Sequence, residues 1–368
     1  MNRRDFIKYG TVLASAGGIF FFYKNGQIFV KDIAEKKTDA DIRPCKRPFE
    51  CLEIHSNGKT YPCCPDFLKG QVAAGNIETQ KFDEIWNGKM LTELREKMKK
   101  GDFSMCNREL CCMYDPYFDF NIPRGYEKGP KDIKISYDME CNYKCIICRD
   151  EIKINTPEEM ALYDKVYLPD VLEIAKNAET ITLLGVGEPL FSRHAKHLMQ
   201  ELIKKYPKIR FNLCTNGFFL DEKNLTEIGI QNNIRGAFVS IDAIKDETYS
   251  KIRHPDAFNR VIKNLELMSE WKKQGKIEMI MINFVVHLLN YEELPDFVKF
   301  AQKIDATALI TRYSPWPISE FHKRYDEVAV FEPTNKHYKD FVRIMHNPVF
   351  KDKKHCILEP KLFEIANS

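Results

Sequence analysis

Three cysteines lie close together in the stretch ECNYKCIICRD, near the middle of the chain. Cys141, Cys145 and Cys148 are separated by three and then two residues, and no fourth cysteine follows closely. Four thiolates fill a structural zinc site or a 4Fe-4S cluster, whereas three leave one metal with an open position, which is typical of a catalytic site. The spacing therefore predicts a reactive centre that also takes a small chelating ligand.

The other cysteines are concentrated before this loop. The chain has 12, and the remaining ones are Cys45, Cys51, Cys63, Cys64, Cys106, Cys111, Cys112, Cys214 and Cys356. Disulfides typically stabilise short secreted domains, but 368 residues can bury a large core without them. Adjacent and closely spaced cysteines favour metal or iron–sulfur binding instead. The net charge of +3, with both signs interspersed, gives no support to a nucleic-acid partner.

The amino terminus, residues 1–30, has the pattern of a signal or anchor. A basic start with Arg3 and Arg4 precedes an apolar run from position 9 to position 23, and NRRDFIK resembles a twin-arginine export signal. The run is short for a membrane span, which needs about 20 residues. An anchor facing the cytoplasm, export, and a buried or amphipathic helix remain alternatives.

Two regions follow. Residues 42–120 form a cysteine-bearing module with a helical pattern over 82–101, and residues 130–315 alternate short apolar runs with amphipathic stretches. We expect strands at 132–138, 180–188, 210–217, 236–243, 278–287 and 306–313, and helices at 157–176, 193–205, 221–229, 256–273 and 291–304. This α/β pattern predicts a partial (β/α)6 barrel of the TIM type, with an open doubly wound sheet as the alternative and the site at the carboxyl ends of the strands. Residues 316–368 form a carboxyl-terminal extension.

The CNYKCIIC loop resembles the C-x3-C-x2-C signature of radical S-adenosylmethionine (SAM) enzymes. The resemblance implies that a 4Fe-4S cluster binds SAM at its open iron, donates one electron, and generates a 5′-deoxyadenosyl radical that removes a hydrogen atom from a substrate. Such an enzyme needs a reductant, such as flavodoxin or ferredoxin.

Polar motifs at the other strand ends carry the same resemblance. It implies that GVGEP, with Gly185, Gly187, Glu188 and Pro189, binds the methionine amino group. Ser240 and Asp242 of VSIDA would contact the ribose and carboxylate, Asn283 the ribose, and Ile147 the adenine through its backbone. Individually, the glycines fit a turn, Ser240 and Asp242 a helix cap, and Asn283 a buried core amide.

The module at 42–120 resembles the SPASM or twitch modules of that superfamily, in its lead cysteine, its GKTYPCC segment, its IWN and its closing cysteine pair. Such modules usually follow the barrel, but this one precedes it. The resemblance implies an auxiliary 4Fe-4S cluster. Our choice of ligands is Cys45, Cys64, Cys106 and Cys111, with Cys63 and Cys112 as alternatives, and with zinc as the alternative metal.

The predicted function is therefore hydrogen abstraction by a radical SAM enzyme, working in or facing the cytoplasm. A peptide or protein substrate follows from the SPASM resemblance, and a cell-surface sugar precursor is the alternative. The contrasting hypothesis from another class is an exported, non-catalytic iron–sulfur carrier, which the signal-like start favours.

Overall fold

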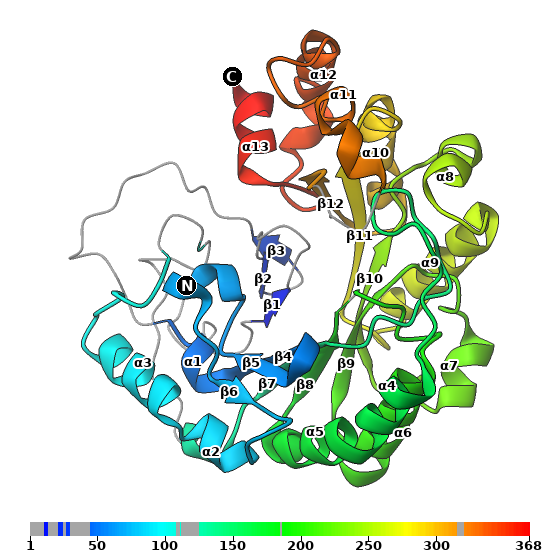
Figure 1. Cartoon of the computed structure of the whole chain (residues 1–368). Helices are drawn as coiled ribbons and strands as arrows, with labels where there is room; N and C mark the ends of the chain where they lie inside the picture. Colours follow the sequence, from blue (N-terminus) through cyan, green and yellow to red (C-terminus); the bar gives the residue numbers. More distant parts are fainter. Residues whose placement is uncertain are drawn as a thin grey trace.

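A long, mostly parallel sheet forms the centre of the molecule. The computed structural model describes residues 45–107, 111, 125–184, 186–314 and 320–368, and three short strands before them. The sheet has ten strands in the order β13-β12-β11-β10-β9-β8-β7-β4-β5-β6. Its parallel strands β7 to β12 are Asp132–Ser136, Thr180–Leu183, Arg210–Thr215, Ile234–Ser240, Met279–Val286 and Thr307–Arg312. They curve into an open arc, so the predicted partial barrel is confirmed (Figure 1).

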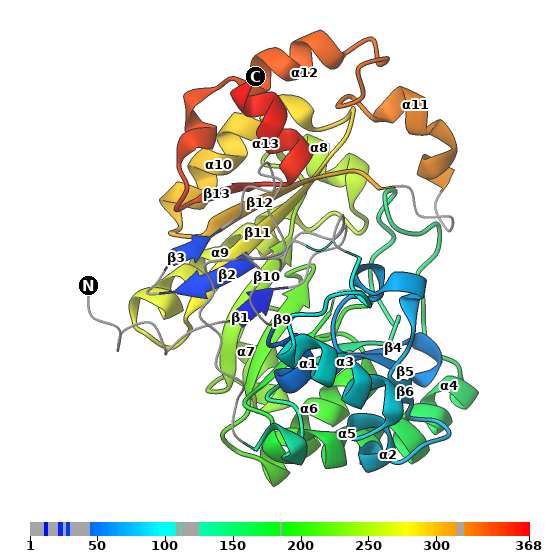
Figure 2. The same cartoon turned by 90° about the vertical axis from the view of Figure 1, so that its left-hand side faces the viewer.

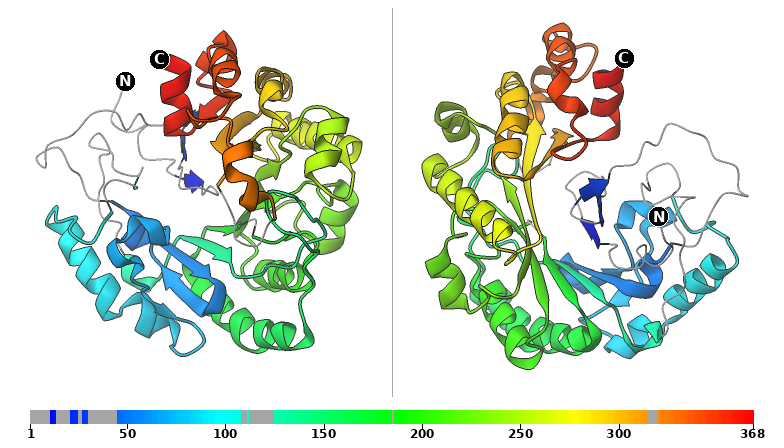
Figure 3. Two further views of the ribbon diagram at one scale, coloured as in Figure 1. Left: turned by 45° about the horizontal axis from the view of Figure 1, so that its top comes forward. Right: turned by 180° about the vertical axis from the view of Figure 1, so that it is seen from behind.

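Helices cover the convex side of this arc (Figure 3). They are α4 Pro157–Leu162, α5 Leu168–Ile174, α6 Arg193–Lys205, α7 Glu222–Ile228, α8 Asp246–Ile252, α9 Phe258–Lys273 and α10 Leu294–Lys303. The helix expected over 157–176 is divided by a π-helical turn at Tyr163–Tyr167. Pro169 explains the division, because it has no N–H to donate to the carbonyl four residues earlier. Helix α8 was not predicted.

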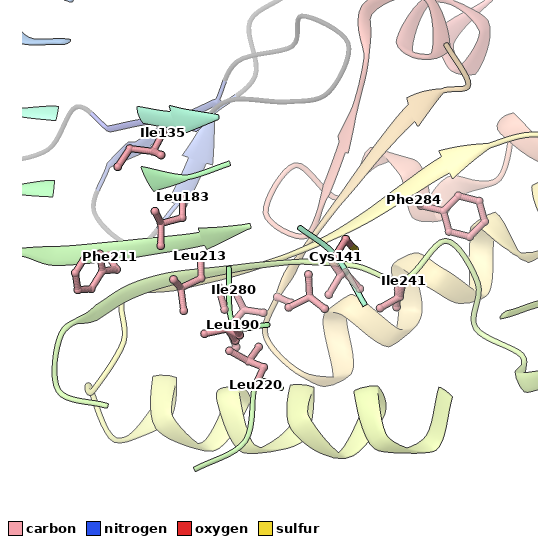
Figure 4. Packing of buried hydrophobic residues seen from close by; sticks show 14 of the residues in the cluster. Ile135, Cys141, Leu183, Leu190, Phe211, Leu213, Leu220, Ile241, Ile280 and Phe284 are labelled. Atoms are coloured by element: carbon pink, nitrogen blue, oxygen red, sulfur yellow. The ribbon is translucent and has the colours of Figure 1, made fainter. Parts of the chain in front are cut away.

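The strands alternate between two environments. Ile133, Ile135 and Leu213 belong to the large apolar cluster shared with the helices, part of which is shown in Figure 4. Successive side chains of a strand point to opposite faces, so Lys134 and Ser136 face the concave side. A smaller cluster of Phe238, Met279, Met281, Leu309 and Ile357 fills part of that side.

The cysteine-bearing module is built onto the barrel sheet. Strand β4 (Cys51–His55) pairs in parallel with β7 and antiparallel with β5 (Lys59–Tyr61), which in turn pairs with β6 (Gly75–Asn76). Helices α1 (Arg47–Glu50), α2 (Phe82–Trp86) and α3 (Lys89–Lys99) complete the module. The helix expected over 82–101 is two helices that divide at Gly88, where a Cβ would lie 2.3 Å from the Glu84 carbonyl oxygen.

The carboxyl-terminal extension adds a strand at the opposite edge. Strand β13 (Cys356–Leu358) pairs in parallel with β12. Helices α12 (Tyr338–Met345) and α13 (Pro360–Asn367) pack against each other beside it (Figure 2). A short helix α11 (Tyr325–Val328) precedes them.

The first 44 residues are described only as three short antiparallel strands, β1 Thr11–Leu13, β2 Phe21–Lys24 and β3 Gln27–Phe29. The signal or anchor expected at 1–30 falls largely outside the described residues and stays a prediction. No helix within the described part of the chain is both long and apolar enough to cross a membrane.

Candidate functional site

The three-cysteine loop follows β7 directly and forms one tight turn. Cys141 and Cys145 are buried and Cys148 is half-buried. The amides of Cys148 and Arg149 both donate to the Cys145 carbonyl, at 2.9 and 3.0 Å, and the Tyr143 amide donates to the Cys141 sulfur at 3.4 Å. Burial raises the pKa of the Cys141 thiol to about 11 and that of Cys145 to about 12. These thiols therefore stay protonated at neutral pH unless a metal displaces the proton.

A distant segment fixes the shape of this loop. The amides of Lys144 and Ile146 donate to the carbonyls of His254 and Ile252, at 2.8 and 3.0 Å. This backbone pairing, which we call the loop strap, joins the cysteine turn to the end of α8. The hydroxyls of Tyr143 and Tyr249 lie 3.0 Å apart and join the same two segments.

The GVGEP segment packs tightly against the chain that enters the cysteine loop. A Cβ on Gly187 would lie 2.5 Å from the Asp138 carbonyl oxygen and 2.7 Å from that of Glu140. The Arg149 guanidinium joins the two segments, donating to the Met139 carbonyl at 2.9 Å and to the Val186 carbonyl. Gly185 lies outside the described residues.

Glu188 is fully buried, and its carboxylate accepts hydrogen bonds from residues at the end of the next strand. One oxygen accepts bonds from the Leu190 amide (3.1 Å) and the Thr215 hydroxyl (2.7 Å), and the other from the Asn216 amide (2.6 Å). Burial raises the pKa of Glu188 to about 7, against these hydrogen bonds, which lower it. The carboxylate thus joins the ends of β8 and β9. Pro189, which follows it, contributes to a small hollow beneath this loop.

Asp242 is also buried, and its carboxylate also accepts hydrogen bonds from protein groups. Its carboxylate accepts two bonds from the Arg253 guanidinium, at 2.9 and 2.5 Å, and one from the Val285 amide at 2.8 Å. Arg253 donates in turn to the Cys145 sulfur at 3.7 Å. Arg253 thus connects Asp242 to the cysteine turn, and the ligand contact expected of Asp242 stays a prediction. Arg253 was not predicted from the sequence, because nothing in the segment KIRHP (residues 251–255) indicates that its arginine is buried.

Ser240 and Asn283 lie side by side on β10 and β11, at paired positions. The Asn283 amide nitrogen donates to the Ser240 hydroxyl at 3.5 Å, and its buried carbonyl oxygen has no hydrogen-bond partner among the residues that the structure describes. An unsatisfied buried acceptor calls for a donor, which a ribose hydroxyl would supply. Ile147 is buried in the main apolar cluster, so only its backbone remains for the predicted adenine contact.

The choice of ligands in the module stays a prediction, and one packing observation bears on it. Cys45 and Cys63 pack against the small apolar cluster that contains Cys106. Burial raises the pKa of Cys63, and among the nearby charges Arg47 lowers it, whereas Glu53, Cys111 and Cys45 raise it. Burial also raises the pKa of Cys64 to about 11, with Glu53 again among the nearby charges. The packing favours the alternative set in which Cys63 takes the place of Cys64 beside Cys45, Cys106 and Cys111.

Within the described residues, no group of three or more His, Cys, Asp and Glu side chains is arranged to hold a single metal ion. In a 4Fe-4S cluster each cysteine binds a different iron, so this finding does not test either cysteine set as a cluster site. The turn of three thiols, the two arginines beside it and the unsatisfied Asn283 oxygen fit a cluster with one open iron and a nucleoside ligand.

Comparison with known proteins gives the class. The family model of the radical SAM superfamily matches residues 139–301, and the SPASM iron–sulfur cluster-binding domain matches residues 45–115. The chain belongs to the radical SAM superfamily of enzymes, with an SPASM module placed before the barrel.

The individual relatives below share less than 30% sequence identity with this chain. GTP 3′,8-cyclase of Synechocystis sp. is 29% identical over 181 residues, which are 49% of this chain and 53% of the relative. GTP 3′,8-cyclase of Nautilia profundicola is 27% identical over 226 residues, 58% of this chain and 66% of the relative. The chain thus spans about half to two thirds of these relatives. Among solved structures, tagged anSMEcpe with bound AdoMet aligns with a TM-score of 0.41 at 19% identity, covering 62% of each chain. Methylornithine synthase aligns at 0.37 and 13%, covering 64% of this chain and 69% of the other.

Proposed function

We propose that Cys141, Cys145 and Cys148 hold a 4Fe-4S cluster at which SAM is reductively cleaved. Such a cluster, when bound, supplies the electron that breaks a sulfonium C–S bond and yields a 5′-deoxyadenosyl radical for hydrogen abstraction. The observation that carries the proposal is the single turn of three thiols after β7, held by the loop strap, with Gly187 packed against the residues that lead into it.

The chain's own residues would have distinct tasks. The GVGEP segment, whose Gly187 lies against the approach to Cys141, would bind the methionine part of SAM through its backbone. Glu188 holds that segment to β9 through Thr215 and Asn216. Ser240 and Asn283 would bind the ribose, and burial around the turn would exclude water from the radical.

Formation of 5′-deoxyadenosine tests the proposal. The full chain is reconstituted anaerobically with iron and sulfide, reduced with dithionite and incubated with SAM. We expect 5′-deoxyadenosine from the parent and from Cys356→Ala, a buried cysteine on the remote strand β13, and none from Cys145→Ala. Cluster-loaded protein that forms no 5′-deoxyadenosine would refute the proposal and favour a non-catalytic iron–sulfur carrier.

We also propose an auxiliary 4Fe-4S cluster in the module, at Cys45, Cys63, Cys106 and Cys111. The support is the packing of Cys45 and Cys63 against the apolar cluster that contains Cys106, and the SPASM match over 45–115. About eight irons per chain are expected for two clusters. About four irons with one zinc would establish the alternative metal.

For the substrate we propose a peptide or protein, because the SPASM module accompanies many enzymes of that kind, with a sugar precursor as the alternative. The curated relatives are named for GTP, but the match leaves a third to a half of their length uncovered. GTP is therefore the first small molecule to test. Its conversion to a cyclised product by the reconstituted chain would overturn the peptide proposal.

The site of action follows from the chemistry. SAM and low-potential electrons are available in the cytoplasm, so we propose that the barrel works in or facing that compartment, with flavodoxin or ferredoxin as electron donor. Membrane attachment through residues 1–30 remains compatible with this. A mature exported form lacking these residues would contradict it.

A further inference from the structure

Arg253 lies between a carboxylate and one of the three cysteines. Its guanidinium donates to the Cys145 sulfur at 3.7 Å and, through two other nitrogens, to Asp242. The Arg253 side chain is 7% exposed and that of Asp242 is 0% exposed. The pair is therefore a buried cation and anion, and the cation also contacts the sulfur of Cys145.

Both members are held rigidly. Asp242 adopts a left-handed backbone conformation, with φ of 55°, and the Asn290 amide donates to its carbonyl at 2.9 Å. Its second carboxylate oxygen is bound by the Val285 amide. Arg253 lies at the end of α8, where its amide donates to the Tyr249 carbonyl at 2.8 Å, within the segment of the loop strap. The distance from the guanidinium to the sulfur is thus set by several independent bonds.

We propose that Arg253, positioned by Asp242, sets the reduction potential of the cluster bound at Cys141, Cys145 and Cys148. The inference rests on the proposed cluster and deepens it by naming what controls its potential. Hydrogen bonds to ligand sulfurs and nearby charge are established determinants of iron–sulfur potentials. A fixed cation stabilises the reduced, more negative form of the cluster more than the oxidised form, and so raises the potential.

Asp242 acts in the opposite sense. Its negative charge offsets part of the guanidinium charge, and burial keeps solvent from screening either one. Removing the cation should therefore lower the midpoint potential. Removing the anion while the cation stays should raise it.

Midpoint shifts of opposite sign in the two variants would distinguish control of the potential from simple structural support. Damage to the loop alone would not raise the potential in one variant and lower it in the other. Arg253→Gln and Asp242→Asn are the decisive variants. Arg253→Lys keeps the charge but lacks the planar fork that reaches two partners at once, so an intermediate potential is expected.

The experiment is a redox titration followed by electron paramagnetic resonance, without SAM, on the reconstituted full chain carrying both clusters. Relative to the parent, we expect a more negative midpoint for the three-cysteine cluster in Arg253→Gln and a more positive one in Asp242→Asn. The auxiliary cluster is the internal control, and its midpoint should stay unchanged.

Three outcomes would overturn the inference: equal midpoints in parent and variants, shifts of the same sign in both variants, or equal shifts of both clusters. If Arg253→Gln fails to take up its cluster, Arg253→Lys and Asp242→Asn decide the matter by the same criterion. If the parent chain takes up no cluster at Cys141, Cys145 and Cys148, the proposed function itself is refuted. Iron analysis of the parent and of Cys145→Ala detects this outcome independently of the redox titration.

Discussion

Cys45 and Cys63 come from separate segments of the module, yet both pack against the small apolar cluster that contains Cys106. Cys64, the next residue along the chain, is half-buried, and the charges near its thiol include Glu53, Asp66 and Lys134. Both cysteines lie beyond β5, which ends at Tyr61, so the alternation of side chains along a strand does not decide between them.

Matched serine substitutions test this assignment. Cys63→Ser should lose about four of about eight irons per chain, because one ligand of the auxiliary cluster is removed. Cys64→Ser should keep them all. Iron and sulfide analysis after anaerobic reconstitution measures both, and the opposite pattern would restore Cys64 as the ligand.

Gly187→Ala should separate the GVGEP segment from the cysteine loop. The new methyl group would lie 2.5 Å from the Asp138 carbonyl oxygen, and backbone atoms cannot move aside as a flexible side chain can. We expect a loss of about 1–3 kcal/mol in the free energy of unfolding and at least a tenfold loss of 5′-deoxyadenosine formation. Gly275→Ala is the control for lost stability: its methyl group meets nothing within 4 Å, but a φ of +72° makes alanine strained there, so it should lower stability and leave 5′-deoxyadenosine formation unchanged. Unaltered activity in Gly187→Ala would show that the two segments need not touch.

Glu188 should make the stability of the fold depend on pH. Burial raises its folded-state pKa to about 7, from an ordinary value of 4.5. A carboxyl group with a raised pKa contributes stability that is complete below the unfolded-state pKa and is lost as the pH rises through the folded-state value. Between pH 4.5 and 8.5, the parent should therefore lose up to about 3 kcal/mol of unfolding free energy relative to Glu188→Gln.

Urea denaturation of the two proteins across this range measures that difference. Glu96→Gln is the control at an exposed position: the hydrogen bond from Lys99 lowers the pKa of Glu96, so this difference should change only near the acidic end of the range. A constant gap between the parent and Glu188→Gln would mean that folding does not change the protonation of Glu188, and would contradict a raised pKa.

The hydroxyl of Tyr167 donates to the Glu78 carboxylate, which joins the barrel to the module. Tyr167→Phe should lower the free energy of unfolding by about 1 kcal/mol, a modest value because Glu78 is exposed. A double-mutant cycle with Glu78→Gln isolates the pair. Tyr206→Phe, which removes a bond to the Leu172 carbonyl, is the matched control and should show no coupling to Glu78→Gln. Zero coupling between Tyr167 and Glu78 would contradict the contact.

Much of the barrel could be predicted from the sequence, because buried parallel strands are short apolar runs separated by amphipathic helices. Every expected strand overlaps an observed one, and the helix expected at 193–205 coincides with α6. Strand β4 was missed although Leu52 and Ile54 alternate with polar residues, because its cysteines drew the interpretation toward metal binding. The division of the helix over 157–176 was missed although Pro169 marks it.

The residue types of the candidate site could be predicted from the sequence, but their hydrogen-bond partners could not. Glu188 and Asp242 stand at the expected strand ends, yet both carboxylates bind protein groups that come from other strands. Those partners are set by strand register, which is a long-range property. The choice between Cys63 and Cys64 likewise depends on tertiary packing, which two identical neighbours in a sequence cannot reveal.

The loop strap also has a consequence for biosynthesis. Cys145 is separated by 108 residues from Arg253, which lies within the segment that holds its loop. On the ribosome, the three thiols are therefore made long before the backbone that shapes their turn. A cluster delivered before α8 has been synthesised would find the cysteine loop without the backbone pairing that shapes it. We expect the scaffold proteins that donate iron and sulfide to act on this chain late in translation or after release.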